Sequence, residues 1–375
     1  MADLRGYQCP TWAESLNQIP KKRTLLANKE TPIHRWSLPG MPTEYDVSVK
    51  RDDMTGCTLS GNKVRKLEFL MAEALEQKCT HVITCGDIHS NHCRATAVVA
   101  RRLGLTPHLI LRANEQGTCA IGCDGNALLT RLCGPNIYLV PHDSGYITEL
   151  KPRMEKLAAA IKDKLGDDSY LIPVAGGSSF PGLFGIISTF EEMILQGLLD
   201  NYDDLVFACS SGCTAAGMSI SNYLTGSKLR CHGVIVCNYT KSYFHDHVDQ
   251  VLRETGLPDD IKANAIVDII EGYQGDGYNK STQKERDFVM SVAETTGVML
   301  DPIYTGKATL GMLRELQNNP QRFKGNRILF LHTGGLFAMY DHHLDATIRR
   351  RGHEENKIYL WSSKDYKPVR IEEYS

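Results

Sequence analysis

The sequence has little of what marks a membrane, secreted or nucleic-acid-binding protein. Its 375 residues contain no run that approaches the roughly 18 apolar residues of a membrane-spanning helix. Lys and Arg number 42 and Asp and Glu number 44, and a net charge of −2 does not favour a nucleic acid or a membrane surface as partner. The first residues, MADLRG, form no hydrophobic signal region. We therefore expect a cytoplasmic globular protein.

Paired cysteine motifs are also missing. The chain has 12 cysteines but no CxxC pair, and scattered cysteines in a chain of this length are typical of reduced, buried thiols. His89, His92 and Cys93 lie close together, but no second ligand pair follows at zinc-finger spacing. We predict no metal site, and a zinc protein is the alternative that metal analysis would test.

Apolar segments of strand length alternate with helical segments along most of the chain. This alternation predicts a parallel α/β fold, in which ligands bind beyond the carboxyl ends of the strands. The loops after Cys85, Cys209 and Leu331 are therefore candidate sites. The predicted strands are 45–50, 81–85, 108–111, 137–140, 170–174, 205–209, 232–237 and 327–331, and the predicted helices include 92–103, 126–132, 151–165, 181–198 and 215–224.

Lys63 stands in the first turn of a further predicted helix, with Ser60 and Asn62 as candidate N-caps. The positive end of a helix dipole favours a neutral amine, and a neutral lysine amine can attack a carbonyl to form a Schiff base. A solvated surface lysine is the plain alternative. One apolar face is expected for this helix, from residues at helical spacing: Leu67, Leu70, Met71 and Ala74.

The loop from Ser210 to Thr214 has the composition of a phosphate cradle between a strand and a helix. It matches neither the Walker pattern nor GxGxxG, so a single phosphate ester fits it best. Taken alone, this loop, the Ser90-Asn91 pair, Tyr278 and Tyr304 have ordinary structural explanations. Together with Lys63 they match what a pyridoxal phosphate site requires.

Four segments resemble the D-cysteine desulfhydrase and 1-aminocyclopropane-1-carboxylate (ACC) deaminase family: 60–70 (SGNKVRKLEFL), 90–95 (SNHCRA), 301–308 (DPIYTGKA) and 332–335 (HTGG). The resemblance implies a fold-type II pyridoxal phosphate enzyme similar to the tryptophan synthase β chain, with two three-layer α/β/α domains and mostly parallel sheets. It also implies a homodimer. We expect a large cofactor-binding domain from residues 1–70 plus 182–375 and a small domain from residues 71–181 that carries the Ser90-Asn91 loop.

The resemblance also implies a role for each matching residue. Lys63 would bind the cofactor aldehyde and move the substrate proton, Asn91 would hydrogen-bond the cofactor's phenolic oxygen, and Ser90 would meet the substrate carboxylate. Tyr278 and Tyr304 would shape the pocket and assist proton transfer. The other expected cofactor-binding residues are Lys66, Ser211, Gly212, Cys213, Thr214, Thr305 and Thr333.

Thr305 and Thr333 stand where ACC deaminases typically carry Glu and Leu, which favours the desulfhydrase branch. A hydroxyl near the pyridine nitrogen gives a less charged ring than a carboxylate does, and this suffices to expel a good leaving group. The predicted reaction is therefore β-elimination and deamination of a small amino acid, with D-cysteine giving pyruvate, hydrogen sulfide and ammonia. The alternatives are ACC deamination to 2-oxobutyrate, elimination or racemisation of another D-amino acid, and a pyridoxal phosphate-binding protein without turnover.

The sequence departs from the family pattern at five positions. Asp87 and His89 replace Gly and Gln, Ser211 and Cys213 occupy glycine positions of the phosphate loop, and Asn279 follows Tyr278 where Gly is usual. An inward-pointing Asp87 would repel the cofactor phosphate. These departures make the substrate, rather than the cofactor, the open question.

Overall fold

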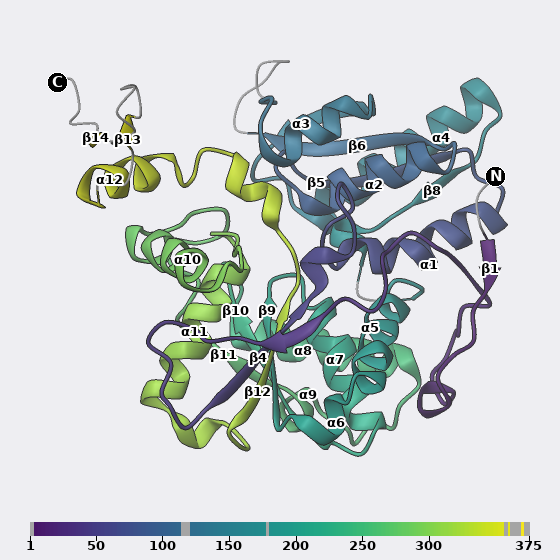
Figure 1. The fold of residues 1–375 in the computed structure, drawn as a ribbon. Helices are drawn as coiled ribbons and strands as arrows, with labels where there is room; N and C mark the ends of the chain where they lie inside the picture. Colours follow the sequence, from purple (N-terminus) through teal and green to yellow (C-terminus); the bar gives the residue numbers. More distant parts are fainter. Residues whose placement is uncertain (1–3, 114–120, 178–179, 356–358, 361–368, 371–375) are drawn as a thin grey trace.

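Two separate sheets organise the chain (Figure 1). The computed structural model describes residues 4–113, 121–177, 180–355, 359–360 and 369–370. The larger sheet has six strands in the order β11-β10-β9-β12-β4-β3, and the smaller has four in the order β7-β6-β5-β8. All neighbouring strands are parallel except β3 and β4, which confirms the predicted α/β fold with mostly parallel sheets.

The strands of the larger sheet are β3 (Ile33–Arg35), β4 (Asp46–Arg51), β9 (Asp204–Cys209), β10 (Arg230–Ile235), β11 (Asp268–Ile270) and β12 (Arg327–His332). Those of the smaller sheet are β5 (His81–Asp87), β6 (Thr106–Ala113), β7 (Asn136–Pro141) and β8 (Ser169–Leu171). Two short antiparallel pairs lie outside these sheets, β1 (Leu4–Gly6) with β2 (Lys22–Thr24) and β13 (Tyr359–Leu360) with β14 (Val369–Arg370).

Helices cover both faces of each sheet. Strand β9 illustrates why the central strands of the larger sheet are apolar along their whole length. Leu205 and Phe207 pack into one core with α5, α7 and α8, while Val206 and Ala208 pack into a second core with α10 and α11. Side chains alternate between faces along a strand, so a sheet covered on both faces buries every residue. The helices are α1 (Lys63–Glu76), α2 (Asn91–Arg102), α3 (Gly125–Leu132), α4 (Lys151–Leu165), α5 (Leu183–Leu195), α6 (Leu198–Asn201), α7 (Cys213–Leu224), α8 (Lys241–Thr255), α9 (Ala263–Ile266), α10 (Gln283–Thr296), α11 (Thr305–Asn318) and α12 (Asp345–Glu355).

Helix α1 lies between the two parts of the molecule, with the smaller sheet above it and α5 below it in Figure 1. Leu67, Leu70, Met71 and Ala74 pack into one core, as expected for the apolar face, but the other sides of the helix are also buried from Val64 to Ala72. The reason is that α1 contacts α2 on one side and α5 on the other. A methyl group at Gly185 of α5 would lie 2.6 Å from the Arg65 carbonyl carbon, so only glycine permits this approach.

The expected elements exist with shifted ends, apart from α4, whose bounds match the expectation. The predicted 181–198 helix is divided at Gly197, whose left-handed φ of +86° ends α5 before α6 begins. Sequence reasoning predicts no helix between residues 238 and 326, where α8 to α11 lie. Among the described residues, no helix has both the length and the hydropathy of a membrane span.

Candidate active site

A cavity of about 1160 Å³ opens where the loops after β5, β9 and β12 meet, as predicted for the loops after Cys85, Cys209 and Leu331. It brings together nine of the twelve predicted site residues: Lys63, Ser90, Asn91, Ser211, Gly212, Thr214, Tyr278, Tyr304 and Thr333. The other three, Lys66, Cys213 and Thr305, are buried beside the cavity and are not part of its lining.

Two glycine-bearing loops form the floor of the cavity. The Asn62 amide donates to the Thr333 carbonyl over 3.0 Å, and a methyl group at Gly334 would lie 2.4 Å from the Gly61 Cα. Gly61 and Gly334 have φ angles of +104° and +101°, in a region that favours glycine. The close approach of these two backbones places the turn before α1 directly against the end of β12.

Lys63 is the first residue of α1 and lines the cavity. Burial and, to a smaller extent, the nearby Lys66 charge lower the pKa of its amine to about 8, and Cys213 opposes the shift. The amine has no hydrogen-bond partner among the described residues. A half-buried, unpaired amine with a lowered pKa is the form of lysine that attacks a carbonyl.

The predicted side-chain caps of α1 are wrong. The Ser60 hydroxyl donates to the Asp53 carbonyl over 2.7 Å, and the Asn62 side-chain amide donates to Thr214 Oγ1 over 3.3 Å. Asn62 already has helical backbone angles, which turn its side chain away from the first N–H groups of α1. Both side chains instead form hydrogen bonds that hold the turn before Lys63 against neighbouring loops.

Ser90 and Asn91 begin α2. Ser90 caps the helix by accepting from the Cys93 amide over 3.2 Å, which is the structural role that the sequence left open for it. Asn91 Oδ1 is buried and has no hydrogen-bond partner. A buried amide oxygen without a partner is costly, so a bound ligand that donates to this atom would complete the site.

Tyr278 and Tyr304 form a half-buried pair, with 2.7 Å between their hydroxyl oxygens. Burial raises the pKa of both hydroxyls, and the Asp87 charge adds to the rise. The backbone N–H of Tyr304 donates to Asp301 Oδ1 over 2.6 Å, and Lys307 Nζ donates to the Gly277 carbonyl over 2.8 Å. Asp301 and Lys307 thus position the two tyrosines, a function that the sequence analysis missed although the DPIYTGKA segment contains both residues.

The phosphate-loop candidates surround the N-terminus of α7. Gly212 is the residue before the helix and has a φ of +85°, while Ser211 and Thr214 line the cavity. The dipole and free N–H groups of a helix N-terminus attract an anion. This cradle and the unpaired Asn91 Oδ1 fit a small phosphorylated ligand that also carries a hydrogen-bond donor.

Internal hydrogen bonds hold two of the three site residues that lie off the cavity wall. Lys66 Nζ donates to the Ala175 and Gly177 carbonyls, and the Thr305 hydroxyl donates to Asp301 Oδ2 over 2.6 Å. Cys213 is the first residue of α7 and is buried. Direct contact of these three side chains with a cofactor stays a prediction.

The structure shows where two residues that depart from the family pattern, Asp87 and Asn279, lie. Asp87 lines the cavity near Arg112, His142 and His89, and burial raises the pKa of its carboxyl while these three groups lower it. Asn279 adopts a φ of +57°, which asparagine tolerates better than most residues, so it can replace glycine there. Among the described residues, no cluster of His, Cys, Asp or Glu is placed to hold a metal ion.

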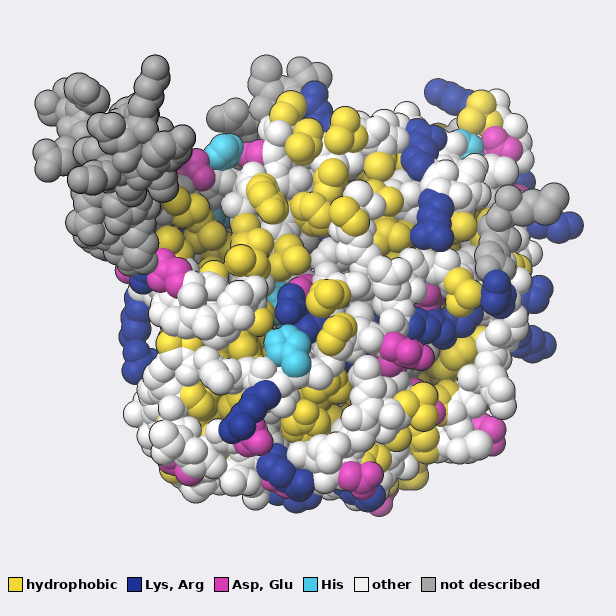
Figure 2. Space-filling model, viewed as in Figure 1, with side chains coloured by type: hydrophobic (Ala, Val, Ile, Leu, Met, Phe, Trp, Pro, Cys, Tyr) yellow, Lys and Arg dark blue, Asp and Glu magenta, His cyan; other side chains and the backbone are white. Residues whose placement is uncertain are grey.

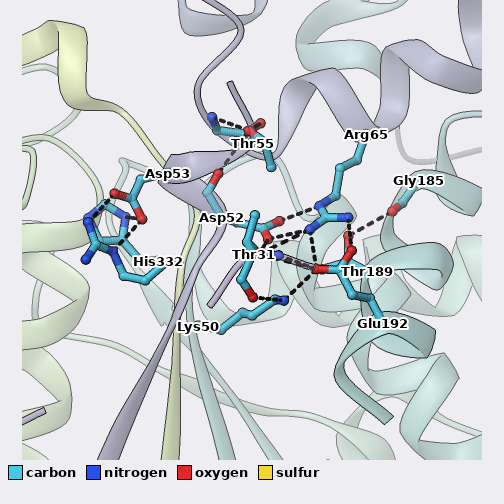
Figure 3. A network of polar contacts seen from close by, with 12 residues as sticks. Thr31, Lys50, Asp52, Asp53, Thr55, Arg65, Gly185, Thr189, Glu192 and His332 are labelled. Carbon is cyan, nitrogen blue, oxygen red and sulfur yellow. Dashed lines mark hydrogen bonds and ion pairs between the residues drawn. The ribbon is translucent and has the colours of Figure 1, made fainter. Parts of the chain in front are cut away.

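A network of buried charges surrounds Arg65 (Figure 3), which follows Lys63 by two residues and so projects from nearly the opposite side of α1. Arg65 donates to both oxygens of Asp52, at 2.8 Å each, and to both oxygens of Glu192, at 2.9 Å each. Lys50 Nζ donates to Glu192 Oε1 over 2.5 Å and to the Thr31 carbonyl over 2.7 Å. Burial favours a neutral Glu192, but Arg65 and Lys50 outweigh it and lower its pKa to about 2. The network joins α1 to β4 and α5.

The fold and this cavity define a class of protein: a parallel α/β enzyme in which an unpaired lysine amine lines the same cavity as a cradle for a single phosphate. A family model described as pyridoxal-phosphate dependent enzyme matches residues 24–334. The chain belongs to this family, and pyridoxal phosphate is its cofactor.

Individual relatives agree with this membership. The chain is 43% identical over 352 residues to a bifunctional D-cysteine desulfhydrase/ACC deaminase, mitochondrial, of Arabidopsis thaliana, with 91% of this chain and 86% of the relative covered. It is 36% identical over 320 residues to a putative ACC deaminase of Thermotoga maritima, with 84% and 96% covered. A crystal structure of an ACC deaminase homologue superposes with a TM-score of 0.76 at 31% identity, covering 91% of this chain and 99% of the other. An O-ureido-L-serine synthase, 16% identical with a TM-score of 0.60 and covering 84% and 93%, shares the fold.

Proposed function

We propose that this protein catalyses the pyridoxal phosphate-dependent β-elimination and deamination of D-cysteine. The overall reaction consumes one water and releases pyruvate, hydrogen sulfide and ammonia. The observation that carries the proposal is the unpaired Lys63 amine with its lowered pKa, facing Asn91 and the tyrosine pair in one cavity. The Arabidopsis thaliana relative, whose name includes D-cysteine desulfhydrase, supports the substrate.

Each residue of the cavity has a task in this proposal. The cofactor, when bound, supplies the electron sink that stabilises negative charge at the substrate α-carbon. Lys63 would hold the cofactor aldehyde, and its Nζ would take the α-proton of the substrate. Asn91 would hydrogen-bond the cofactor's phenolic oxygen, and Ser90 would orient the substrate carboxylate. The Tyr278–Tyr304 pair stands ready to give a proton to the departing sulfur, because burial keeps both hydroxyls protonated.

ACC deamination is the second candidate function. The Arabidopsis thaliana and Thermotoga maritima relatives carry this activity in their names. The Thr305 and Thr333 positions, which resemble the desulfhydrase branch, favour D-cysteine over ACC. The placement of Thr305 on Asp301 weakens this argument, because the hydroxyl is already engaged.

A substrate panel tests the proposal. The purified protein is incubated with D-cysteine, L-cysteine, ACC, D-serine and β-chloro-D-alanine, and sulfide, pyruvate and 2-oxobutyrate are measured. We expect sulfide and pyruvate in equal amounts from D-cysteine. Release of 2-oxobutyrate from ACC without sulfide from D-cysteine would overturn the preferred substrate. A bound cofactor whose absorbance responds to none of these compounds would indicate a binding protein without turnover.

We further propose a homodimer in the cytoplasm, with the two domains at residues 1–70 plus 182–375 and 71–181. Exposed apolar side chains support an interface with a second copy: α3 carries Leu128 and Leu132, the latter 74% exposed. Figure 2 shows hydrophobic side chains gathered over the part of the molecule where Figure 1 draws α3 and β6. Light scattering tests the mass, limited proteolysis tests the boundaries, and imaging of the tagged full chain tests the location.

A further inference from the structure

His247 of α8 lies against the phosphate loop, although no motif of the sequence pointed to it. A methyl group at Gly212 would lie 2.3 Å from His247 Cδ2 and 2.9 Å from its Nε2, so this edge of the ring rests on the glycine that directly precedes α7. His247 also lines the cavity together with Ser211 and Thr214. It therefore borders the space above the N-terminus of α7, where an anion is most favoured.

One nitrogen of the His247 ring lacks a hydrogen-bond partner. Its Nε2 atom is buried and has no hydrogen-bond partner. The ring is held from the other side by Tyr243, with parallel planes at 7° and centroids 6.1 Å apart, and Tyr243 in turn stacks on Tyr239 at 4.1 Å. A ring fixed by stacking and left with a buried, unpaired nitrogen fits a ligand that supplies the missing partner.

The charges around His247 also favour an anion. Lys66 is close enough to lower the pKa of His247, and it lowers the pKa of Lys63 and His92 in the same way. Glu254 is the carboxylate that opposes this effect at His247, where burial is the largest cause of the lowered pKa. Several mutually repelling groups beside one helix N-terminus are stabilised when an anion binds among them.

We propose that His247 is a phosphate-binding residue of the cofactor site, which donates its Nε2–H to the phosphate of pyridoxal phosphate and closes the cradle over Gly212. A neutral imidazole has one N–H donor and suffices for this bond. The proposal rests on the cofactor assignment and adds a residue from a helix outside the phosphate loop. It also gives the α8 segment that follows β10 a function in cofactor retention.

The test compares a phosphorylated ligand with an unphosphorylated one. Equilibrium dialysis of the full chain against pyridoxal phosphate and against pyridoxal gives two dissociation constants for each variant. We expect His247→Leu to weaken pyridoxal phosphate binding by about tenfold to a hundredfold, the range for a hydrogen bond to a charged group, and pyridoxal binding by less than about twofold. His247→Gln, which keeps an N–H donor, should recover part of the loss.

His245→Leu is the matched control. His245 lies on the same helix and has a buried, unpaired Nε2, but it is not part of the cavity lining. We expect both of its dissociation constants to equal those of the wild type. An equal loss for the two ligands in His247→Leu, or no loss for either, would overturn the proposal, and His247→Gln decides it if the leucine variant does not fold. A wild-type chain that binds neither ligand would instead overturn the cofactor assignment.

Discussion

Two polar regions meet at the start of α1 and differ in how completely their groups are paired. Behind the helix, Arg65 makes four hydrogen bonds to Asp52 and Glu192. In front of it, the Lys63 amine, Asn91 Oδ1 and His247 Nε2 are buried or enclosed without partners. Lys63 and Arg65, the lysine and the arginine of the two regions, are two residues apart, about half a turn of helix.

Leaving a buried polar atom unpaired costs about 1–3 kcal/mol, so a cluster of such atoms is informative. The paired network needs nothing more than the folded chain, whereas the unpaired cluster needs a ligand. The difference indicates a division of labour: the network fixes the position of α1, and the cavity keeps its polar atoms free for the cofactor. Substitutions on the two sides of α1 should therefore have opposite consequences for stability and activity.

The largest effect is expected on the cavity side. Lys63→Ala should reduce turnover at least about a thousandfold, because it removes the group that binds the cofactor aldehyde and moves the α-proton. Stability should change by no more than about 1 kcal/mol, since the amine has no partner to lose. Steady-state rates and chemical denaturation measure the two properties. A variant that keeps its turnover would contradict the assignment, and Lys164→Ala on the exposed end of α4 is the control.

The reverse pattern is expected on the network side. Arg65→Met keeps the length of the side chain but leaves the Asp52 and Glu192 carboxylates buried without their main partner. Breaking a buried ion pair in this way costs about 3–5 kcal/mol. Arg153→Met is the matched control, because Arg153 pairs with Glu149 on the surface and such pairs contribute about 0–1 kcal/mol. Denaturation curves that shift equally for both variants would show that the network contributes no more than a surface pair.

The cavity side could largely be predicted from the sequence, because its residues belong to short motifs in the loops that follow predicted strands. Parallel strands appear as short apolar runs, and the loops at their carboxyl ends must meet at one edge of the sheet. Motifs in these loops, such as SGNK and HTGG, therefore signalled residues that the fold brings together. Gly61 and Gly334 extend this argument, because their backbones touch across about 270 residues of chain.

The network side could not be predicted, because it depends on pairing between distant segments. Arg65 lies two residues from Lys63 and looks like a solvated charge, while its partner Glu192 is 127 residues away. The burial of α1 on nearly all sides has the same origin, since it depends on Gly185 of another helix. His247 was missed because α8 was not predicted. A helical pattern of Phe244, Val248 and Val251 was available there as a signal.

A smaller effect is expected from acid, which should remove the stability that the charged Glu192 contributes to the network. Glu192 has a pKa of about 2 in the folded protein against an ordinary 4.5, because Arg65 and Lys50 favour its charged form more than burial opposes it. A lowered folded pKa stabilises the protein above pH 4.5, and this contribution is lost as the pH falls from 4.5 toward 2. Glu192→Gln should be less stable at neutral pH, and its difference from the wild type should narrow across this window. Denaturation midpoints at several pH values measure it, and a constant difference would contradict it.

The smallest effect is the influence of the Lys66 charge on the pKa of the Lys63 amine. The Lys63 amine reacts in its neutral form, so the rate of pyridoxal association should rise with pH through about 8 and then level off. Lys66 lowers the pKa of Lys63 through its charge, and Lys66→Gln should therefore move this midpoint upward. Pyridoxal is the right probe, because it has no phosphate with which Lys66 could interact directly. Lys164→Gln should leave the midpoint in place, and a Lys66→Gln midpoint that falls or stays unchanged would show that Lys66 does not tune the Lys63 amine.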